Sequence, residues 1–549
     1  MDNNKKVKIY IGLLITVTIL VGVTYAYYRL YKTQTNDNVI GTRSCLDTSF
    51  TEDTSEIILS DAFPIDDSDG LQEDPFSFTL TNNCDSYVDV QITLYSEYRT
   101  STSSTYLKDD YVKVNLSPKG ATTGTSNILS SLSLGDIDTT RKAYILEETG
   151  LKGNETKSHD LRLWMNSETT NEQGLNKTWK GKIIVTVTAA KEPPTFAETI
   201  LANNEVKTPT TTPGAEISSS TEAVLASAED DYGTSYYFRG AVTNNFVEYA
   251  NMCWRIVRIT GNGAIKLVLY NYNGLTDSNT IPSSSTPCSV TGDYLAFARY
   301  EGTSYYTKFN DKYNDNAYVG FMYGKTGANS YNETHANTNA STILTNLNKW
   351  YTNVLSKQTN FKDSQLADTI WCNDKSVVTD TTFNPNSLTL GTNYGYATNT
   401  NYYSANKRLV QASSWSAGGT GPSLICPNDN NGGKLSKLTV SDTKYGNGNL
   451  DKKIGLLTAD ELALAGYAGV LQNSTTYLQE NATDTWWWSL SPGRFDGSGA
   501  YVWRVGNSAG GFADGGVSGA GGFRPSISLK STTNVTGDGT SDTPYKIVS

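Results

Sequence analysis

Charge, histidine and closely spaced cysteine are all scarce in this chain of 549 residues. Charged residues make up 18% of it, the net charge is −11, and Lys and Arg form no cluster beyond the first residues. Binding to nucleic acid needs clustered cations to meet the phosphates, so we expect no nucleic-acid partner. Two histidines, His159 and His335, and no C-x-x-C occur, so we expect no metal site and no cofactor.

Tyrosine is abundant instead, with 35 residues. Its side chain combines a large contact area, a hydroxyl group and little rotamer entropy, which suits binding surfaces. Hydrophobic residues reach 37%, enough for folded cores. At ~100–200 residues per domain, the length predicts more than one domain.

An uncharged segment of 20 residues, Ile9 to Tyr28, follows a lysine-rich stretch at positions 5–8. As a helix it would span ~30 Å, the thickness of the hydrocarbon layer. The lysines favour the cytoplasmic side, so we expect residues 1–36 to hold a single-pass membrane anchor and the body to be extracellular. Residues 24–26, Thr-Tyr-Ala, also fit a signal-peptidase site, and cleavage would release a secreted protein.

Alternating apolar and polar residues dominate positions 37–190. Val88, Val90, Ile92 and Leu94 are separated by polar residues, and similar patterns occur near residues 76–80, 161–165 and 183–187. A period of two indicates strands with one buried face. Several such strands between polar loops predict an all-β sandwich.

Residues 191–231 differ in composition, with Pro-Pro, Thr-Thr-Thr-Pro-Gly and Ser-Ser-Ser runs that are typical of a linker. Phe196, Ile200 and Leu201 fit one short helix inside it.

Residues 232–549 predict an α+β domain. A β-hairpin is expected from Trp254 to Tyr270, across the turn residues 261–263. Apolar residues at helical spacing predict a helix between Ser341 and Leu355. A second helix should begin at Thr458, where Glu461 completes a capping box.

The domain boundaries divide the cysteines into two groups. There are six, an even number that predicts disulfides in an exported chain: Cys45, Cys84, Cys253, Cys288, Cys372 and Cys426. Membership of the first domain pairs Cys45 with Cys84. The other four allow three pairings, of which proximity favours Cys253 with Cys288 and Cys372 with Cys426.

Two motifs near the C-terminus carry a family resemblance. Residues 486–493 read Trp-Trp-Trp-Ser-Leu-Ser-Pro-Gly, and residues 522–527 read Gly-Phe-Arg-Pro-Ser-Ile. The pair resembles the signature of C-type-lectin-like domains of the formylglycine-generating-enzyme type, many of which belong to bacterial surface proteins. Further likeness to one subgroup lies in residues 231–240, 253–257, 318–324 and 454–461. The resemblance covers about residues 230–549, implies the fold, supports the last two cysteine pairs and leaves the function open.

The first domain resembles the exported β-sandwiches of camelysin and of biofilm-fibre subunits. The resemblance depends on Tyr25-Ala26-Tyr27 at the end of the export segment and on Thr81-Asn82-Asn83-Cys84 at a strand end.

Catalytic chemistry finds little support. Paired cysteines leave no reactive thiol for an oxidase. We expect both histidines to be solvated, and likewise the acidic runs Asp109-Asp110 and Glu229-Asp230-Asp231, which have a weak calcium site as their alternative. The calcium-binding triplets of sugar-binding C-type lectins do not occur in the sequence.

The segment between the two signature halves is the predicted binding face. Its strand pattern and glycines predict exposed aromatic and Arg side chains, which are common in binding hot spots. In relatives of this fold the same span contacts ligands. The candidate binding residues are Arg494, Phe495, Tyr501, Trp503, Arg504 and Phe512. Trp487 and Arg524, inside the signature, are expected to serve folding, as are at least two of the three adjacent Trp rings.

These patterns predict a cell-surface-anchored binding or adhesion protein and not an enzyme. A β-sandwich stalk would display the C-type-lectin-like domain to an unknown extracellular protein or glycan ligand. A structural subunit of an extracellular fibre or biofilm matrix is one alternative. A secreted enzyme of unidentified chemistry is another.

Overall fold

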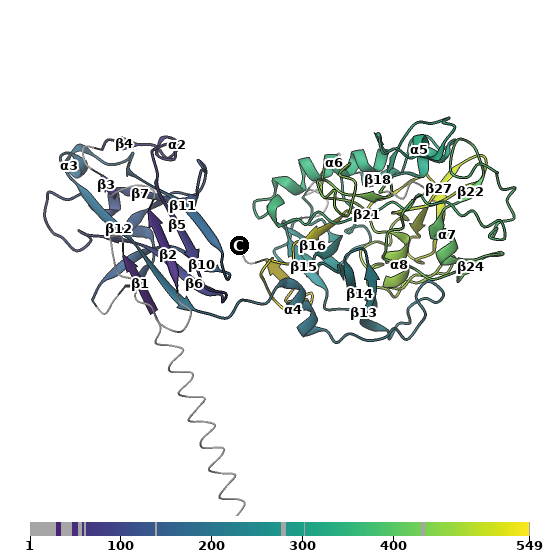
Figure 1. Cartoon of the computed structure of the whole chain (residues 1–549), viewed down its shortest axis with the longest axis horizontal. Helices are drawn as coiled ribbons and strands as arrows, with labels where there is room; N and C mark the ends of the chain where they lie inside the picture. Colours follow the sequence, from purple (N-terminus) through teal and green to yellow (C-terminus); the bar gives the residue numbers. More distant parts are fainter. Residues whose placement is uncertain are drawn as a thin grey trace, which may run out of the picture. The chain divides into compact units, whose positions relative to one another are not determined.

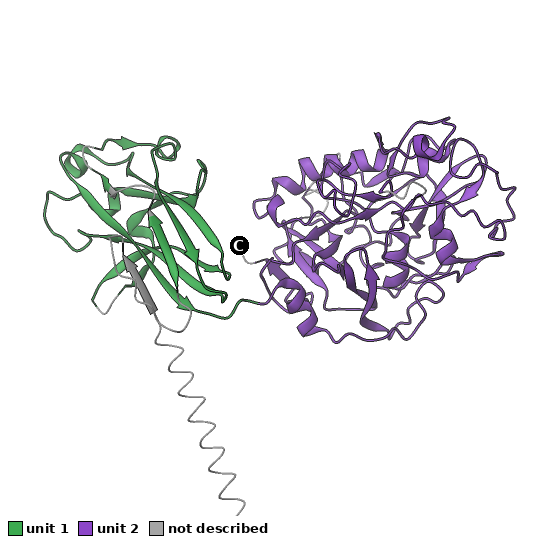
Figure 2. Ribbon diagram, in the orientation of Figure 1, with its two compact units in different colours: residues 1–193 green, residues 194–549 purple. Residues whose placement is uncertain are grey.

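The computed structural model divides into two compact units, residues 1–193 and 194–549 (Figure 2). The structure describes residues 29–33, 47–52, 57–59, 62–137, 140–275, 282–300, 302, 304–429 and 434–547. Among these, no helix combines the length and apolar character needed to cross a membrane. The expected membrane segment, Ile9 to Tyr28, lies outside the described residues.

The first unit is built from two β-sheets (Figure 1). One sheet has the order β1-β12-β6-β10-β9, with β3 also paired to β12, and the other has the order β2-β5-β11-β7-β8, with β4 paired to β11. The strands are β1 Arg29–Thr33, β2 Thr48–Glu52, β3 Ile57–Leu59, β4 Pro64–Ile65, β5 Phe76–Asn82, β6 Val88–Ser96, β7 Val112–Pro118, β8 Asn127–Ile128, β9 Leu134–Asp136, β10 Lys142–Leu151, β11 Thr156–Asn166 and β12 Trp179–Ala189. Four short helices join them: α2 Asp67–Gly70, α3 Asn171–Gly174, η1 Asp109–Tyr111 and η2 Leu129–Ser131.

One hydrophobic core joins the two sheets, since Phe78 and Leu161 from one sheet and Ile92 and Val185 from the other belong to the same buried cluster. The predicted sandwich is therefore confirmed. Its start was placed too late at residue 37, because β1 begins at Arg29 and pairs antiparallel with β12.

The predicted linker 191–231 is wrong over most of its length. Helix α4, Phe196–Asn203, begins at Thr195 with a capping box, and its Phe196 and Ile200 are buried in the core of the second unit. Strand β13, Ala223–Asp230, then forms the edge of a sheet. Composition marked the segment as a linker because only a few of its residues are apolar, but those few pack against the unit that follows. The predicted short helix is confirmed.

The second unit contains two larger sheets. The first has the order β13-β14-β16-β15-β32-β31, and β17 joins β16 to β30. The second has the order β18-β29-β26-β27-β28, with β22 paired to β26. Their remaining strands are β14 Gly233–Gly240, β15 Phe246–Tyr249, β16 Met252–Ile259, β17 Ile265–Asn271, β18 Tyr306–Lys308, β22 Asn401–Tyr402, β26 Trp487–Phe495, β27 Ala500–Val505, β28 Phe512–Gly516, β29 Ala520–Gly522, β30 Ser526–Leu529, β31 Val535–Thr536 and β32 Tyr545–Ile547.

Small hairpins and helices fill the rest of this unit. The two-stranded pairs are β19 Met322–Tyr323 with β20 Asn339–Ala340, β21 Trp371–Cys372 with β25 Lys437–Leu438, and β23 Val410–Gln411 with β24 Ser414–Ala417. The helices are α5 Tyr331–Thr334, α6 Thr342–Asn353, α7 Ser404–Leu409, α8 Ala459–Ala465, η3 Pro287–Ser289, η4 Asn316–Val319, η5 Leu355–Lys357 and η6 Asp363–Gln365. The unit is thus α+β, as predicted.

Three local predictions in this unit are confirmed. The hairpin is β16 and β17, which pair antiparallel. Helix α6 begins after Ser341, whose hydroxyl accepts from the backbone N–H of Leu344. Helix α8 begins after Thr458, and the capping box with Glu461 is present.

Two of the three predicted disulfides are present in the structure. Cys253 bonds to Cys288 and Cys372 bonds to Cys426. Cys84 is also disulfide-bonded. Its predicted partner, Cys45, lies outside the described residues.

Candidate functional site

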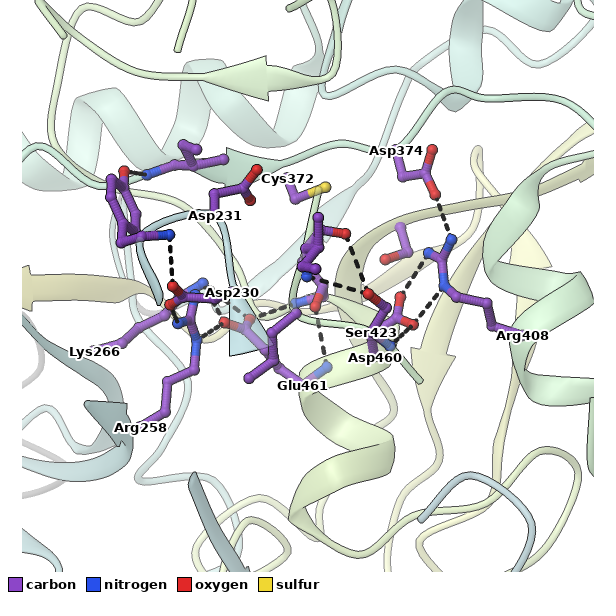
Figure 3. Close-up of a pocket in the computed structure, with 16 residues that line it drawn as sticks. Asp230, Asp231, Arg258, Lys266, Cys372, Asp374, Arg408, Ser423, Asp460 and Glu461 are labelled. Atoms are coloured by element: carbon purple, nitrogen blue, oxygen red, sulfur yellow. Dashed lines mark hydrogen bonds and ion pairs between the residues drawn. The ribbon is translucent and has the colours of Figure 1, made fainter. Parts of the chain in front are cut away.

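A cluster of charged side chains, most of them buried, lines a small pocket in the second unit (Figure 3). Arg258 on β16 donates to Asp230 at 2.6 Å and to Glu461 at 2.8 Å. Lys266 on β17 donates to both oxygens of Glu461, at 2.7 and 2.9 Å. The capping carboxylate of α8 therefore also neutralises two cations on the neighbouring sheet.

A second ion-pair group adjoins the first. Arg408 on α7 donates from Nε and Nη2 to the two oxygens of Asp460, at 2.6 and 2.8 Å, and from Nη1 to Asp374 at 2.8 Å. Asp460 also accepts the backbone N–H of Ser423 at 3.0 Å. Figure 3 shows these side chains pointing toward one another from separate segments of the chain.

The electrostatics of this cluster indicate a structural role. Burial lowers the pKa of Lys266 to about 8, against the opposing charge of Glu461. Burial alone would raise the pKa of Glu461, but Lys266 and Arg258 outweigh it and lower the value to about 2. The cavity among these side chains has a volume of about 20 Å³, which is room for about one water molecule. These charges satisfy each other, as the members of a structural ion-pair network do.

The same contacts correct the expectation for part of the acidic runs: Asp110 and Glu229 are exposed, as expected, but the other three carboxylates are not. Asp230 is buried, and Asp231 accepts from Lys437 at 2.8 Å and from the backbone N–H of Cys426 at 2.8 Å. Asp109 in the first unit is also buried and accepts from the indole of Trp179 at 2.7 Å. These carboxylates are partners of protein donors and are not solvated.

Three of the six predicted binding residues are buried. Phe495, Trp503 and Phe512 are 0% exposed. Trp503 donates its indole N–H to Asn406 at 2.6 Å, and its ring lies 4.7 Å from that of Phe512. The prediction that these three residues face a ligand is wrong.

The packing around β27 explains the error. β27 pairs with β28 in a regular register from Tyr501 to Val505, so Tyr501 and Trp503 share one side of the strand. Trp503 is buried there because its ring stacks on that of Trp415 and its indole N–H reaches Asn406, both from segments distant in sequence. The half-exposed side chains of β27 are Tyr501 and Arg504.

Arg494 and Tyr501, two of the other predicted residues, lie with Asp514 on one side of β27. Arg494 Nη1 donates to both oxygens of Asp514, at 3.1 and 2.8 Å. Its guanidinium carbon lies 4.3 Å from the centre of the Tyr501 ring and 5.3 Å from that of Trp415 on β24. Arg504, the third residue, follows Tyr501 by three positions in a regular register with β28, so it lies on the other side of the strand, beside Trp486. We call both groups together the arginine face, a name that covers the two sides of β27; its members are Arg494, Tyr501, Arg504, Asp514, Trp415 and Trp486.

Glycines make room for the large side chains around Arg504. The guanidinium of Arg504 lies 4.9 Å from the centre of the Trp486 ring system. A Cβ added at Gly515 would lie 2.5 Å from Arg504 Nε, and one added at Gly521 would lie 2.4 Å from the Trp486 ring. The large side chains can lie along the sheet because these two positions carry no side chain.

The charge of the arginine face depends on Asp514. Burial raises the pKa of Asp514 to about 6, although Arg494 and Arg504 oppose the shift. The face holds two cations and one carboxylate, so it carries net positive charge. Sequence reasoning missed Asp514 and Trp415; Trp415 lies about 80 residues before Arg494 in the chain, and no local pattern links the two.

The framework around this face follows the prediction. Trp487 and Trp488 are buried, while Trp486 is half-buried. Arg524 is buried, lies 4.7 Å from the centre of the Trp487 ring and donates to the backbone carbonyls of Leu269, at 3.0 Å, and Leu478.

Both histidines are buried, against expectation. His335 is 0% exposed, its Nε2 contacts the carbonyl of Gly395 at 2.7 Å, and burial together with the charge of Lys375 lowers its pKa to about 3. His159 lies on β11, where its ring stacks on Phe78. The local sequence around each histidine, an Asn-rich loop for His335 and a strand for His159, did not indicate this burial. The side chains that enclose the two rings come from distant segments.

Neither a metal site nor a comparison with known proteins indicates a function for the second unit. Within the part of the chain that the structure describes, no three His, Cys, Asp or Glu side chains converge so as to hold a metal ion. No family model, no curated protein and no solved structure matches the chain.

Proposed function

We propose that the chain is a cell-surface binding protein whose second unit recognises an extracellular protein or glycan through the arginine face. The observation that carries the proposal is the stacking of Arg494 on Tyr501 and of Arg504 on Trp486, on the two sides of β27. Arg and aromatic side chains dominate binding hot spots, since they offer fixed donors beside broad apolar area.

The ligand chemistry follows from these groups. A guanidinium donates paired N–H groups in a plane that fits a carboxylate, sulfate or phosphate. The rings of Trp415, Tyr501 and Trp486 offer faces for a sugar ring or an aromatic side chain. An acidic glycan or an acidic, aromatic segment of a protein would engage both kinds of group.

The rest of the proposal concerns display. The second unit would be a C-type-lectin-like domain, which the motif resemblance and the buried pair Trp487–Arg524 support. The uncharged N-terminal segment would anchor the chain in the membrane, and the sandwich would serve as a stalk.

The test begins with arrays of glycans and extracellular proteins, probed with the full chain. For a captured ligand, Arg504→Ala and Arg504→Lys should each weaken binding at least tenfold, because neither variant retains the planar donor pair. Lys308→Ala changes an exposed cation on the same sheet and should leave the affinity unchanged. Unaltered capture by a correctly folded Arg504→Ala variant would reject the arginine face as the site.

A fibre subunit is the second candidate, because the first unit exposes apolar side chains around a hollow. Phe63 is 81% exposed and Leu175 is 65% exposed. Both line a hollow of about 280 Å³ with Met165 and Pro64. A second copy of the chain would cover this surface. Sedimentation of the full chain should then show concentration-dependent assembly that Phe63→Ser abolishes, and a monomer at all concentrations would exclude it.

A further inference from the structure

Lys266 and Lys375 are fully buried among the described lysines, and they have different partners. Lys266 meets a carboxylate. Lys375 meets a neutral carboxamide: its Nζ donates to Oδ1 of Asn337. Two backbone carbonyls complete its surroundings, those of Met322 at 3.2 Å and His335 at 3.3 Å.

Asn337 is held in place for this contact. Its Nδ2 donates to the carbonyl of Leu435 at 2.8 Å, which fixes Oδ1 toward Lys375. Its backbone adopts φ 55°, in the left-handed region that Asn tolerates better than most residues. The carbonyl carbon Cγ therefore lies one bond beyond the oxygen that Lys375 Nζ already touches.

A carboxylate accompanies the pair. Asp429 is buried, and its negative charge acts on the ammonium of Lys375. Lys375 lies three residues after Cys372, and Asp429 lies three residues after Cys426. The Cys372–Cys426 disulfide, with its Cα atoms 5.5 Å apart, thus ties the segments that carry the lysine and the acid.

We propose that Lys375 and Asn337 form an intramolecular isopeptide bond, with Asp429 as the proton carrier. The neutral amine of Lys375 attacks Cγ of Asn337, and the Nζ–Cγ bond forms. Asp429 takes a proton from the attacking nitrogen and delivers it to Nδ2, and the Cγ–Nδ2 bond then breaks. One amine and one carboxamide become one secondary amide and one ammonia molecule, so no oxidant or cofactor is needed.

The surroundings of Lys375 favour its nucleophilic form. Burial lowers its pKa to about 7, against the weaker pull of Asp429. A large fraction is therefore neutral near physiological pH, as nucleophilic catalysis by lysine requires. The contact with Oδ1 also holds the amine close to the reacting carbon, which removes the entropic cost of bringing the two groups together.

Lys266 provides the contrast. Arg258 donates to Glu461 and helps to hold its pKa near 2, so this carboxylate stays ionised. A carboxylate is a poor electrophile, and Glu461 opposes the loss of the Lys266 proton that burial favours. We therefore assign the reaction to Lys375 and not to Lys266.

The bond would close a covalent loop from residue 337 to residue 375 beside the disulfide loop from 372 to 426. The first loop contains α6 and the second contains α7. Cross-links of this kind stabilise a folded chain by restricting the unfolded one.

Mass spectrometry of the purified full chain, reduced and alkylated, tests the proposal. The wild type should be lighter than its calculated mass by one ammonia, about 17 Da, and a proteolytic map should contain one branched peptide joining residues 337 and 375. Lys375→Arg keeps the positive charge but has no amine nucleophile, so it should show the calculated mass and two separate peptides. Lys437→Arg, an ion-paired lysine elsewhere in the unit, should keep the mass loss.

Asp429→Asn should leave the branched peptide at a small fraction of the wild-type yield. A folded wild type with the calculated mass and separate peptides for residues 337 and 375 would overturn the proposal. That measurement needs no variant, so it decides the question even if Lys375→Arg fails to fold. Complete cross-linking in Asp429→Asn would overturn the role of Asp429 alone.

Discussion

Lys266 donates to both oxygens of the Glu461 carboxylate, and neither side chain is exposed by more than 2%. Glu461→Gln keeps a capping residue at the start of α8 but leaves Lys266 and Arg258 without their shared counter-charge. Removing one partner from a buried ion pair costs about 3–5 kcal/mol. We expect a loss of this size in the free energy of unfolding of the second unit, measured by denaturant titration with tryptophan fluorescence.

The matched control is Asp311→Asn, which removes the carboxylate of an exposed pair with Lys308. Its effect should lie within the error of the titration, because surface ion pairs contribute little. An equal loss in both variants would show that the buried network has no special weight.

Trp503→Ala should lower the stability of the second unit, and any loss of binding should follow from that loss of stability. The side chain is buried between Phe512 and Trp415 and donates to Asn406. Truncating a buried Trp costs about 3–5 kcal/mol, so the melting temperature should fall by several degrees. Full stability with lost ligand capture would restore Trp503 to the binding surface.

His335 should make the second unit acid-sensitive. Its folded pKa of about 3 lies below the value near 6.5 of the unfolded chain, so the unfolded state binds one more proton between these pH values. The stability present above pH ~6.5 is therefore lost as pH falls, by up to about 1.4 kcal/mol per pH unit. Asp514, with its raised pKa, acts in the opposite direction between pH ~4 and 6.

The two effects are separated by comparing wild type with His335→Gln. The difference between their free energies of unfolding should change with pH across the range from 6.5 to 4.5. A constant difference would mean that His335 is not buried as a neutral ring.

Ligand capture should depend on the charge of Asp514. Below pH ~6 its carboxyl is protonated, which leaves Arg494 and Arg504 uncompensated. Affinity for an anionic ligand should increase several-fold from pH 7.5 to pH 5, and Asp514→Asn should bind tightly at both values. Titration calorimetry at the two pH values gives both affinities, and a flat wild-type profile would contradict the assignment.

Local patterns predicted what depends on neighbouring residues. The capping box at Thr458, the β16–β17 hairpin and helix α6 follow from spacing over a few positions, and two disulfides follow from proximity. The burial of Trp503 did not, because the side chains that cover it, Trp415 and Asn406, come from distant segments. The Arg258–Glu461 pair joins residues 203 positions apart, and periodicity carries no record of such a contact.

The same limit applies to the proposed binding face. Alternation along β27 placed Tyr501 and Trp503 on one side of the strand, as the structure does, but gave no sign that Trp415 covers Trp503 while Tyr501 stays half-exposed. Glycines at 515 and 521 were visible in the sequence, but the side chains that they accommodate belong to this chain and not to a ligand.

Strand β32 pairs parallel with β15, and β30 pairs antiparallel with β17, so residues near 250 and 270 find their partners near 545 and 527. Contacts between positions so far apart in sequence slow folding, because a long loop must close before they form. The first large sheet of the second unit can be completed only after residues 545–547 have been synthesised. Until then, nearly 300 residues of the unit remain incompletely folded and prone to aggregation. Binding to a chaperone would protect the chain most during this period.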